Sequence, residues 1–204
     1  MNFAEAIAYL KNTSPLRITI SGDIGAGKST FAKHLSEKLG IPRVYIGQLM
    51  REEAARRHLT LDAFNALLET DDTIDRYMDD LQKEKSRQIE RGIFEGRTSW
   101  HFVENPDVRV FLAVNPHTAA QRIWEDNNAL RDTYDSIDAL AEANEQRKAS
   151  ENARYQAYYG IDAYNPKNFD IIVDTTSLNI SHVFEQGVTK IADTLKNRHK
   201  TPNS

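Results

Sequence analysis

The sequence predicts an α/β fold in which a five-stranded parallel sheet carries helices on both faces. Short apolar runs rich in β-branched residues alternate with stretches of helical periodicity, and no internal repeat interrupts them. Such alternation favours a parallel sheet, because two parallel neighbours need a crossover connection that a helix provides. The predicted strands are Leu16–Ile20, Arg43–Ile46, Gly92–Phe94, Val108–Val114 and Phe169–Val173.

Composition and charge exclude several classes of protein. The chain has 204 residues, is 40% hydrophobic and carries a formal charge of −4. No apolar run approaches the roughly 20 residues that cross a bilayer, and the first residues have no basic cluster of a signal peptide. The absence of cysteine excludes disulfides and thiol chemistry. We therefore expect a cytoplasmic protein without a nucleic-acid partner, since nucleic-acid binding favours a basic face.

The segment after the first predicted strand has the pattern of a phosphate-binding loop. It reads Gly-x-x-x-x-Gly-Lys-Ser from Gly22 to Ser29, and helical periodicity begins at Phe31. Glycines allow consecutive N–H groups to face one anion, and the helix N-terminus adds partial positive charge. This context predicts a P-loop NTPase fold that binds ATP through Gly22, Gly25, Ala26, Gly27, Lys28, Ser29 and Thr30.

Two residues of this loop have a predicted chemical role. Lys28 is expected to reach the β- and γ-phosphates, and the Ser29 hydroxyl is expected to help hold Mg²⁺. Glu95, at the end of the third predicted strand, is expected to act on the same Mg²⁺ through water or to pair with Lys28. A glycine-rich turn without a ligand is the alternative, and the complete pattern with its flanks disfavours it.

Two connections between strands are longer than a crossover needs. The chain is predicted to be a single domain, 1–204, whose core spans about 15–46, 91–115 and 165–195. Ligands of doubly wound folds bind beyond the carboxyl ends of the strands. Residues 47–90 are therefore expected to form a helical acceptor-binding insertion, and residues 116–164 a lid. A helix over residues 3–11 and a frayed polar tail over Lys196–Ser204 flank this core.

Arginines follow the predicted strand ends and recur in the lid. Arg97 comes directly after a glycine and a strand that is expected to be buried, where an unpaired guanidinium needs an anion; a surface salt bridge is the alternative. In the lid, Arg147, Glu151 and Arg154 are spaced so that they share one face of a helix. Two arginines on either side of a carboxylate can hold a phosphate, while the carboxylate keeps them extended or accepts from a base amino group.

Together these motifs resemble the cytidylate kinases of the short-lid type, over Ile18 to Asp174. The resemblance implies an ATP- and Mg²⁺-dependent nucleoside monophosphate kinase that phosphorylates CMP or dCMP. The motifs that carry it are Gly22–Thr30, Gly47–Arg51, Glu95–Arg97 and Arg147–Tyr155 with Tyr159–Asp162.

The resemblance also implies roles for single residues. Gly47, Arg51 and Arg97 would bind the acceptor monophosphate, and Arg122 would contact ATP. Arg147 and Arg154 would close on the transferring group, with Glu151 between them. The implied residues are, for catalysis, Lys28, Arg97, Arg147 and Arg154; for the acceptor, Gly47, Arg51, Arg97, Arg147, Glu151 and Arg154; and for the metal, Ser29 and Glu95.

The sequence departs from the cytidylate kinase pattern at three places. They lie near the expected acceptor pocket, so they concern the identity of the acceptor base. Tyr45-Ile46 replace small residues, Thr98-Ser99-Trp100 follow Arg97, and Lys148-Ala149 stand where acidic residues are usual. One alternative is a P-loop kinase of another nucleotide or metabolite, with Asp23 or Glu95 as the base for a hydroxyl acceptor. Another is a nucleotide-sensing regulatory protein, which would not need four arginines. A monomer is expected.

Overall fold

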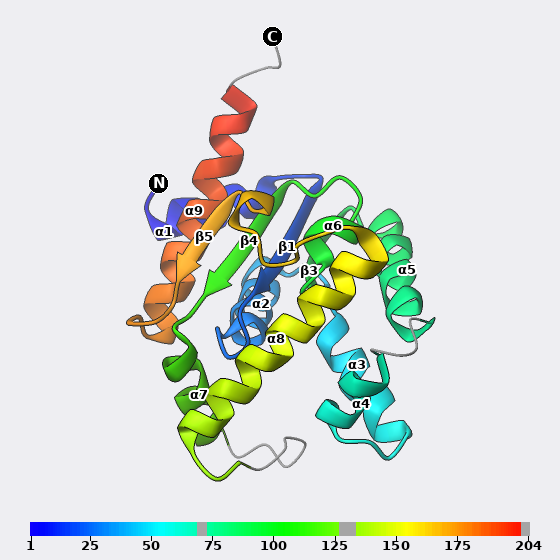
Figure 1. The fold of residues 1–204 in the computed structure, drawn as a ribbon. Helices are drawn as coiled ribbons and strands as arrows, with labels where there is room; N and C mark the ends of the chain where they lie inside the picture. The colour runs from blue at the N-terminus through cyan, green and yellow to red at the C-terminus, as the bar shows by residue number, and fades with distance from the viewer. Residues whose placement is uncertain (69–72, 127–133, 201–204) are drawn as a thin grey trace.

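A computed structural model describes residues 1–68, 73–126 and 134–200 (Figure 1). Its strands form one parallel sheet in the order β2-β3-β1-β4-β5, which confirms the predicted fold class. The strands are β1 (Leu16–Gly22), β2 (Arg43–Tyr45), β3 (Arg91–Glu95), β4 (Val108–Ala113) and β5 (Ile171–Asp174). The strand that leads into the phosphate loop is thus the central one.

The register of the sheet aligns the carboxyl ends of three strands. Ile20 of β1 pairs with Glu95 of β3, and Tyr45 of β2 pairs with the same glutamate. The residues that follow these strands therefore emerge side by side at one edge of the sheet, as in other doubly wound folds.

One face of the sheet is covered by α1 (Phe3–Asn12), α2 (Lys28–Leu39) and α9 (Ile180–Lys200). The main apolar core lies here, because alternate residues of β1, among them Ile18 and Ile20, point toward these helices. The α2 helix fills the layer with Phe31 and Leu35, and α9 adds Ile191.

The opposite face is aromatic and partly polar. It is covered by α6 (Ser99–Phe102), by α5 (Thr73–Gln88) beside it, and by α8 (Ile137–Tyr159), which crosses in front of the sheet in Figure 1. The rings of Phe111 and Phe169 lie 4.8 Å apart, and those of Phe102 and Tyr159 lie 4.9 Å apart. The contact between Phe102 and Tyr159 holds the carboxyl end of α8 against the domain.

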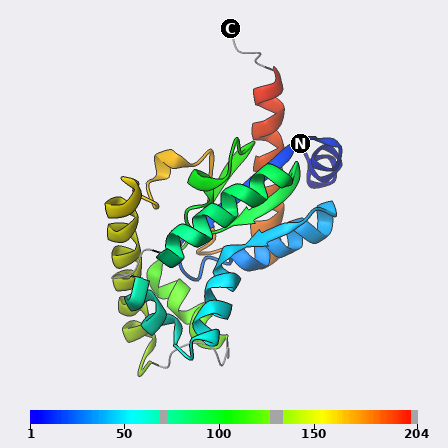
Figure 2. The same ribbon diagram turned by 90° about the vertical axis from the view of Figure 1, so that its right-hand side faces the viewer.

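Apart from the turn before β5, the remaining elements lie beyond the carboxyl ends of the strands (Figures 1 and 2). In the segment predicted as an acceptor-binding insertion, α3 (Ile46–Arg56) packs against α4 (Leu61–Leu68) around the buried Phe64. In the segment predicted as a lid, α7 (Pro116–Glu125) packs along α8. A short 3₁₀ turn, η1 (Pro166–Asn168), returns the chain to β5.

The prediction of a frayed tail from Lys196 is wrong over residues 196–200, because α9 continues through Lys200. Long-range contacts hold this polar stretch: Arg198 donates to the Asp107 carbonyl (2.5 Å) and to Asp170 Oδ1 (2.6 Å). Residues 201–204 lie outside the described part of the chain. Among the described residues, no helix has the length and apolar character that would let it span a bilayer.

Candidate active site

A cavity of about 930 Å³ lies at the carboxyl edge of the sheet, between the phosphate loop, α3 and α8. Its wall combines segments that are far apart in the sequence, including both lid helices and residues 175–184. Nearly every predicted site residue lines it: Gly25, Ala26, Gly27, Lys28, Ser29, Thr30, Gly47, Arg51, Glu95, Arg97, Arg122, Arg147, Glu151 and Arg154. Gly22 is the exception and lies behind the loop, against β4.

The glycines of the loop serve two different needs. A Cβ on Gly22 would lie 2.2 Å from the carbonyl oxygen of Leu112, so this glycine lets the loop start close to β4. Gly27 has a φ of 83° and precedes α2 without a side-chain cap. The first N–H groups of α2 are therefore left for a ligand, which suits an anion at this helix end.

Lys28 is held back on its own loop. Its Nζ donates to the carbonyl oxygens of Gly22 (2.8 Å) and Asp23 (2.5 Å). Burial, together with the positive charge of Arg97, lowers the pKa of Lys28 to about 7. An anion entering the loop would favour the charged lysine, so the pKa of Lys28 is expected to rise when phosphate binds.

Ser29 and Glu95 lie at the centre of a second group of contacts. Ser29 Oγ is 2.7 Å from Glu95 Oε1 and 2.8 Å from the Tyr45 hydroxyl. Glu95 is 1% exposed, and its Oε2 accepts from Arg43 Nε (2.8 Å) and Nη2 (2.5 Å). Glu95 is thus paired with Arg43. The alternative prediction, that Glu95 pairs with Lys28, is wrong in the ligand-free protein, where Lys28 donates to the carbonyl oxygens of Gly22 and Asp23. Sequence reasoning missed Arg43, because one arginine on a strand carries no local signal.

Arg51 meets the same group from the acceptor side. Its Nη1 donates to the Tyr45 hydroxyl at 2.5 Å, and the Tyr45 ring stacks on Arg43, whose guanidinium carbon is 4.3 Å from the ring centroid. A Cβ on Gly47 would lie 2.8 Å from this ring, so the glycine makes room for Tyr45.

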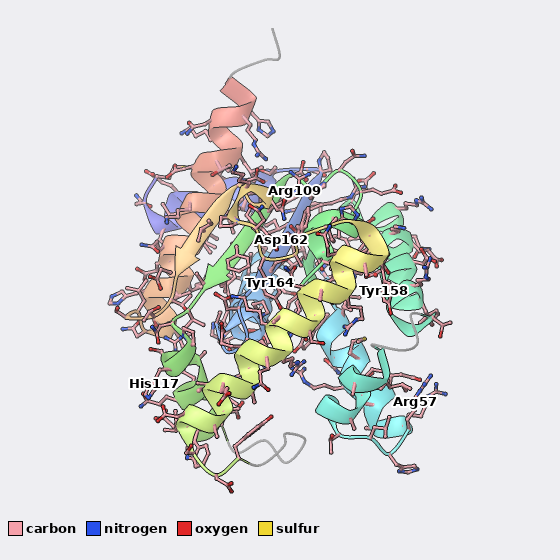
Figure 3. All side chains as sticks on the ribbon, viewed as in Figure 1. Arg57, Arg109, His117, Tyr158, Asp162 and Tyr164 are labelled. Atoms are coloured by element: carbon pink, nitrogen blue, oxygen red, sulfur yellow. The ribbon has the colours of Figure 1, made fainter. Side chains whose placement is uncertain are left out.

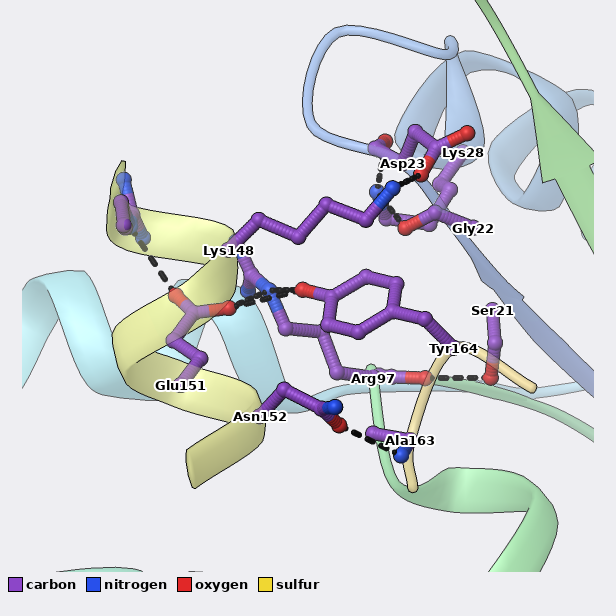
Figure 4. A network of polar contacts seen from close by, with 12 residues as sticks. Ser21, Gly22, Asp23, Lys28, Arg97, Lys148, Glu151, Asn152, Ala163 and Tyr164 are labelled. Carbon is purple, nitrogen blue, oxygen red and sulfur yellow. Dashed lines mark hydrogen bonds and ion pairs between the residues drawn. The ribbon is translucent and has the colours of Figure 1, made fainter. Parts of the chain in front are cut away.

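On the lid, Glu151 gathers the arginines (Figure 4). It forms an ion pair with Arg97 and accepts from Arg147 Nε (2.9 Å) and the Tyr164 hydroxyl (3.0 Å). Tyr164 also accepts from Arg97 Nε at 3.1 Å. Burial would raise the pKa of Glu151, but Arg97 and Arg147 outweigh it and hold that pKa below its usual range.

Tyr164 is the second residue that sequence reasoning missed, since the lid motif ends at Asp162 and nothing nearby marks the tyrosine. Burial, and then the charge of Glu151, raises the pKa of Tyr164 well above its usual value, so the hydroxyl stays protonated. Figure 3 places Tyr164 between α8 and the sheet. Both oxygens of Glu151 are thus engaged, so in the ligand-free protein this carboxylate keeps the arginines in place.

A further contact ties the lid to the phosphate loop. Lys148 Nζ lies 2.6 Å from Asp23 Oδ1 and 4.9 Å from the centroid of the Tyr164 ring (Figure 4). The other oxygen of Asp23 accepts from the Val114 N–H at 3.2 Å. The departure at Lys148 therefore has a structural consequence, since an acidic residue there would face Asp23.

The two remaining predicted arginines sit at opposite ends of the lid. Arg154 is 6% exposed and its guanidinium carbon lies 5.5 Å from the Tyr155 ring. Arg122 donates to the Thr175 carbonyl (2.6 Å) and hydroxyl (3.1 Å), which attaches α7 to the loop after β5. The described residues contain no group of three or more His, Cys, Asp or Glu side chains that could hold a metal by themselves.

The fold and the loop define a P-loop kinase-like protein, and solved structures agree. A shikimate kinase from Bacteroides thetaiotaomicron superposes with a TM-score of 0.61 at 18% identity, covering 89% of this chain and 98% of its own. Shikimate kinase from Acinetobacter baumannii in complex with shikimate gives 0.57 at 14% identity, covering 94% and 98%. At these identities the likeness establishes the fold alone.

The chain belongs to the cytidylate kinase-like family, whose profile matches residues 17–177. A cytidylate kinase from Methanothrix thermoacetophila is 39% identical over 158 residues, covering 78% of this chain and 87% of that protein. The cytidylate kinase of Methanocella arvoryzae is 35% identical over 180 residues, covering 88% and 98%. Family membership makes the chain a phosphotransferase and confirms the resemblance inferred from its motifs.

Proposed function

We propose that this protein transfers the γ-phosphoryl group of ATP to the 5′-phosphate of CMP or dCMP. The observation that supports this most directly is that one cavity is lined by the phosphate loop and by Arg51, Arg97, Arg147 and Arg154. A triphosphate and a monophosphate together need this many cations, whereas a nucleotide sensor needs only the loop. The name shared by the archaeal relatives supports cytidylate as the acceptor.

The acceptor is already an anion, so the transfer needs no general base. An oxygen of the acceptor phosphate attacks the γ-phosphorus, and the bond from that phosphorus to the β–γ bridging oxygen breaks as its electron pair leaves with ADP. Catalysis is then a matter of positioning and charge neutralisation. Asp23, the base candidate for a hydroxyl acceptor, has both carboxylate oxygens engaged, by Lys148 and by the Val114 N–H.

On the donor side, Lys28 would exchange its two carbonyl partners for the β- and γ-phosphates. The N–H groups of Gly25 to Thr30 and the start of α2 would hold the remaining charge, and Arg122 would lie beside the nucleotide. Ser29 would be the protein ligand of Mg²⁺, with Glu95 behind it. The few oxygen ligands that the protein offers here fit Mg²⁺, which usually binds one or two protein oxygens together with phosphate oxygens. When bound, the ion would neutralise phosphate charge.

On the acceptor side, Arg51 and Arg97 would bind the monophosphate, with Gly47 beside them. Arg147 and Arg154 would spread their charge over the group in transfer. Glu151 positions both Arg97 and Arg147, and the contact between Lys148 and Asp23 keeps the lid helix near the loop. Such closure excludes water, which would otherwise compete for the phosphoryl group.

The acceptor preference is tested by a screen of ATP consumption over all ribo- and deoxynucleoside monophosphates. We expect CMP and dCMP to be best, UMP next and purine monophosphates poor. The Glu151 carboxylate could accept from the cytosine amine, and a carbonyl in place of that amine would leave the carboxylate mismatched, which costs about 1–3 kcal/mol, or roughly ten- to a hundredfold. Comparable rates with AMP or GMP would replace cytidylate by another acceptor. ATP binding with no activity on any monophosphate would favour a metabolite kinase or a regulatory protein.

Donor binding has a predicted pH dependence. The pKa of Lys28 is about 7 in the ligand-free protein, and phosphates raise it, so ATP binding at pH 8 should take up protons. The affinity for ATP should accordingly fall as the pH rises above about 7. Calorimetry at pH 8 in EDTA, in buffers of different ionisation enthalpy, measures the uptake. Lys28→Ala should abolish it, and an uptake of zero in the unmodified protein would contradict the assignment.

A further inference from the structure

The Tyr45 hydroxyl stands between the donor and acceptor halves of the cavity. It lies 2.5 Å from Arg51 Nη1 on the acceptor side and 2.8 Å from Ser29 Oγ in the phosphate loop. Its ring is fixed by stacking on Arg43, which is itself paired with the buried Glu95. The side chain is therefore anchored from the sheet, while its oxygen contacts both halves of the site.

The number of hydrogens on each group determines which group donates in each of these hydrogen bonds. A guanidinium can only donate and a carboxylate can only accept, whereas each hydroxyl has a single hydrogen. Ser29 must therefore give its hydrogen to Glu95, 2.7 Å away, and Tyr45 must give its own to Ser29. Arg51 donates to the Tyr45 oxygen. The chain of donors thus runs from Arg51 through Tyr45 and Ser29 to Glu95.

This direction leaves Ser29 suited to a cation. The serine oxygen accepts one hydrogen bond, from Tyr45, and keeps a second lone pair. Because the Ser29 hydrogen points to Glu95, this lone pair is free to bind a cation and no hydrogen lies in the way. The same chain determines where the Arg51 guanidinium rests when the cavity holds no acceptor.

We propose that Tyr45 is a positioning residue that couples the two substrates, a proposal that rests on the function proposed above. When the donor and its cation fix Ser29, they fix the Tyr45 hydroxyl and through it Arg51, so the acceptor meets a guanidinium that is already ordered. Binding of one ligand then lowers the ordering cost for the other, and the coupling is reciprocal.

The test uses Tyr45→Phe, which keeps the ring on Arg43 and removes only the hydroxyl. CMP affinity is measured by calorimetry with and without a non-hydrolysable imido analogue of ATP and Mg²⁺. In the unmodified protein the analogue should tighten CMP binding several-fold. In Tyr45→Phe this enhancement should fall to about one, and CMP alone should bind roughly tenfold more weakly, as loss of a hydrogen bond from a charged group predicts.

A second measurement tests the role of Ser29 in the absence of CMP. The Mg²⁺ concentration that half-maximally strengthens binding of the analogue should rise roughly three- to tenfold in Tyr45→Phe, because Ser29 loses its orienting donor. Thermal melting checks that the variant is folded. This arm involves neither turnover nor CMP, so it holds even if the acceptor is another molecule.

Two tyrosine variants serve as matched controls. Tyr164→Phe removes the hydroxyl that contacts Arg97 and Glu151, so it should weaken CMP binding while keeping the enhancement by the analogue. Tyr9→Phe, whose hydroxyl contacts His199 on the far side of the domain, should change neither.

The outcomes separate the two proposals. If the unmodified protein binds no CMP, the proposed acceptor is wrong, and the Mg²⁺ arm decides the role of Tyr45. If Tyr45→Phe keeps both the enhancement and the Mg²⁺ dependence, coupling through Tyr45 is overturned while the proposed function stands. Equal weakening of CMP binding with and without the analogue also overturns coupling, because it would confine Tyr45 to Arg51.

Discussion

Lys28→Ala is expected to lower the turnover number by about 10²- to 10³-fold, with little change in folding. The lysine is the one cation that the phosphate loop itself supplies for the β- and γ-phosphates, and loss of one preorganised donor to developing charge costs about this much. Its partners in the ligand-free protein are two carbonyl oxygens of its own loop, so no distant contact depends on it.

The effect of Lys28 on the free energy of unfolding depends on pH. Burial lowers the pKa of Lys28 to about 7, so the folded protein binds the lysine proton more weakly than the unfolded chain does. The buried charge therefore opposes folding below pH 7, and this cost fades as the pH rises toward the usual lysine value. Lys28→Ala should not lower the melting temperature at neutral pH.

Lys33→Ala is the matched control, because Lys33 lies on the same helix with an exposed side chain 4.0 Å from Glu37. Neither its turnover nor its melting temperature should change measurably. Near-normal turnover of Lys28→Ala would contradict the placement of the donor phosphates.

Alanine variants of Arg97 and Arg154 are expected to change different kinetic parameters. Arg97→Ala should raise the Michaelis constant for the monophosphate far more than that for ATP, because in the proposed function Arg97 would contact the acceptor in both ground and transition states. Arg154→Ala should chiefly lower the turnover number, because its proposed contact with the transferring group would form mainly in the transition state. Steady-state kinetics with each substrate varied in turn measures the difference, and a loss confined to ATP affinity in both variants would refute the acceptor assignments.

Arg97 also has a structural partner, so its variant needs a stability control. Breaking a buried ion pair typically costs about 3–5 kcal/mol, and Arg147 and Tyr164, which still contact Glu151, should reduce that cost here. Arg97→Ala combined with Glu151→Gln should recover part of the melting temperature but not the affinity for the monophosphate. Arg56→Ala, on an exposed face of α3 beside Glu53, should leave both kinetics and melting unchanged.

The sequence determined the central part of this protein because that part is local. Strand, glycine loop and helix are contiguous, so the pattern from Gly22 to Thr30 predicts a phosphate site without reference to any long-range contact. Helical spacing likewise placed Arg147, Glu151 and Arg154 on one face, which α8 bears out. Hydrophobic periodicity and the alternation of elements were enough for the parallel sheet.

Tertiary structure alone decided how these parts meet. Lys148 and Asp23 are 125 positions apart, Ser29 and Glu95 are 66 apart, and Arg97 and Tyr164 are 67 apart. Sheet register and the seating of α8 set such pairs, and neither leaves a mark in a short window of sequence. The end of α9 also depends on distant residues. The sequence predicted a frayed polar stretch there, but it is helical because Asp107 and Asp170, on loops far away in the sequence, accept hydrogen bonds from Arg198. Local chemistry is encoded in adjacent residues, whereas the partner of a buried charge is fixed only when the chain closes around it.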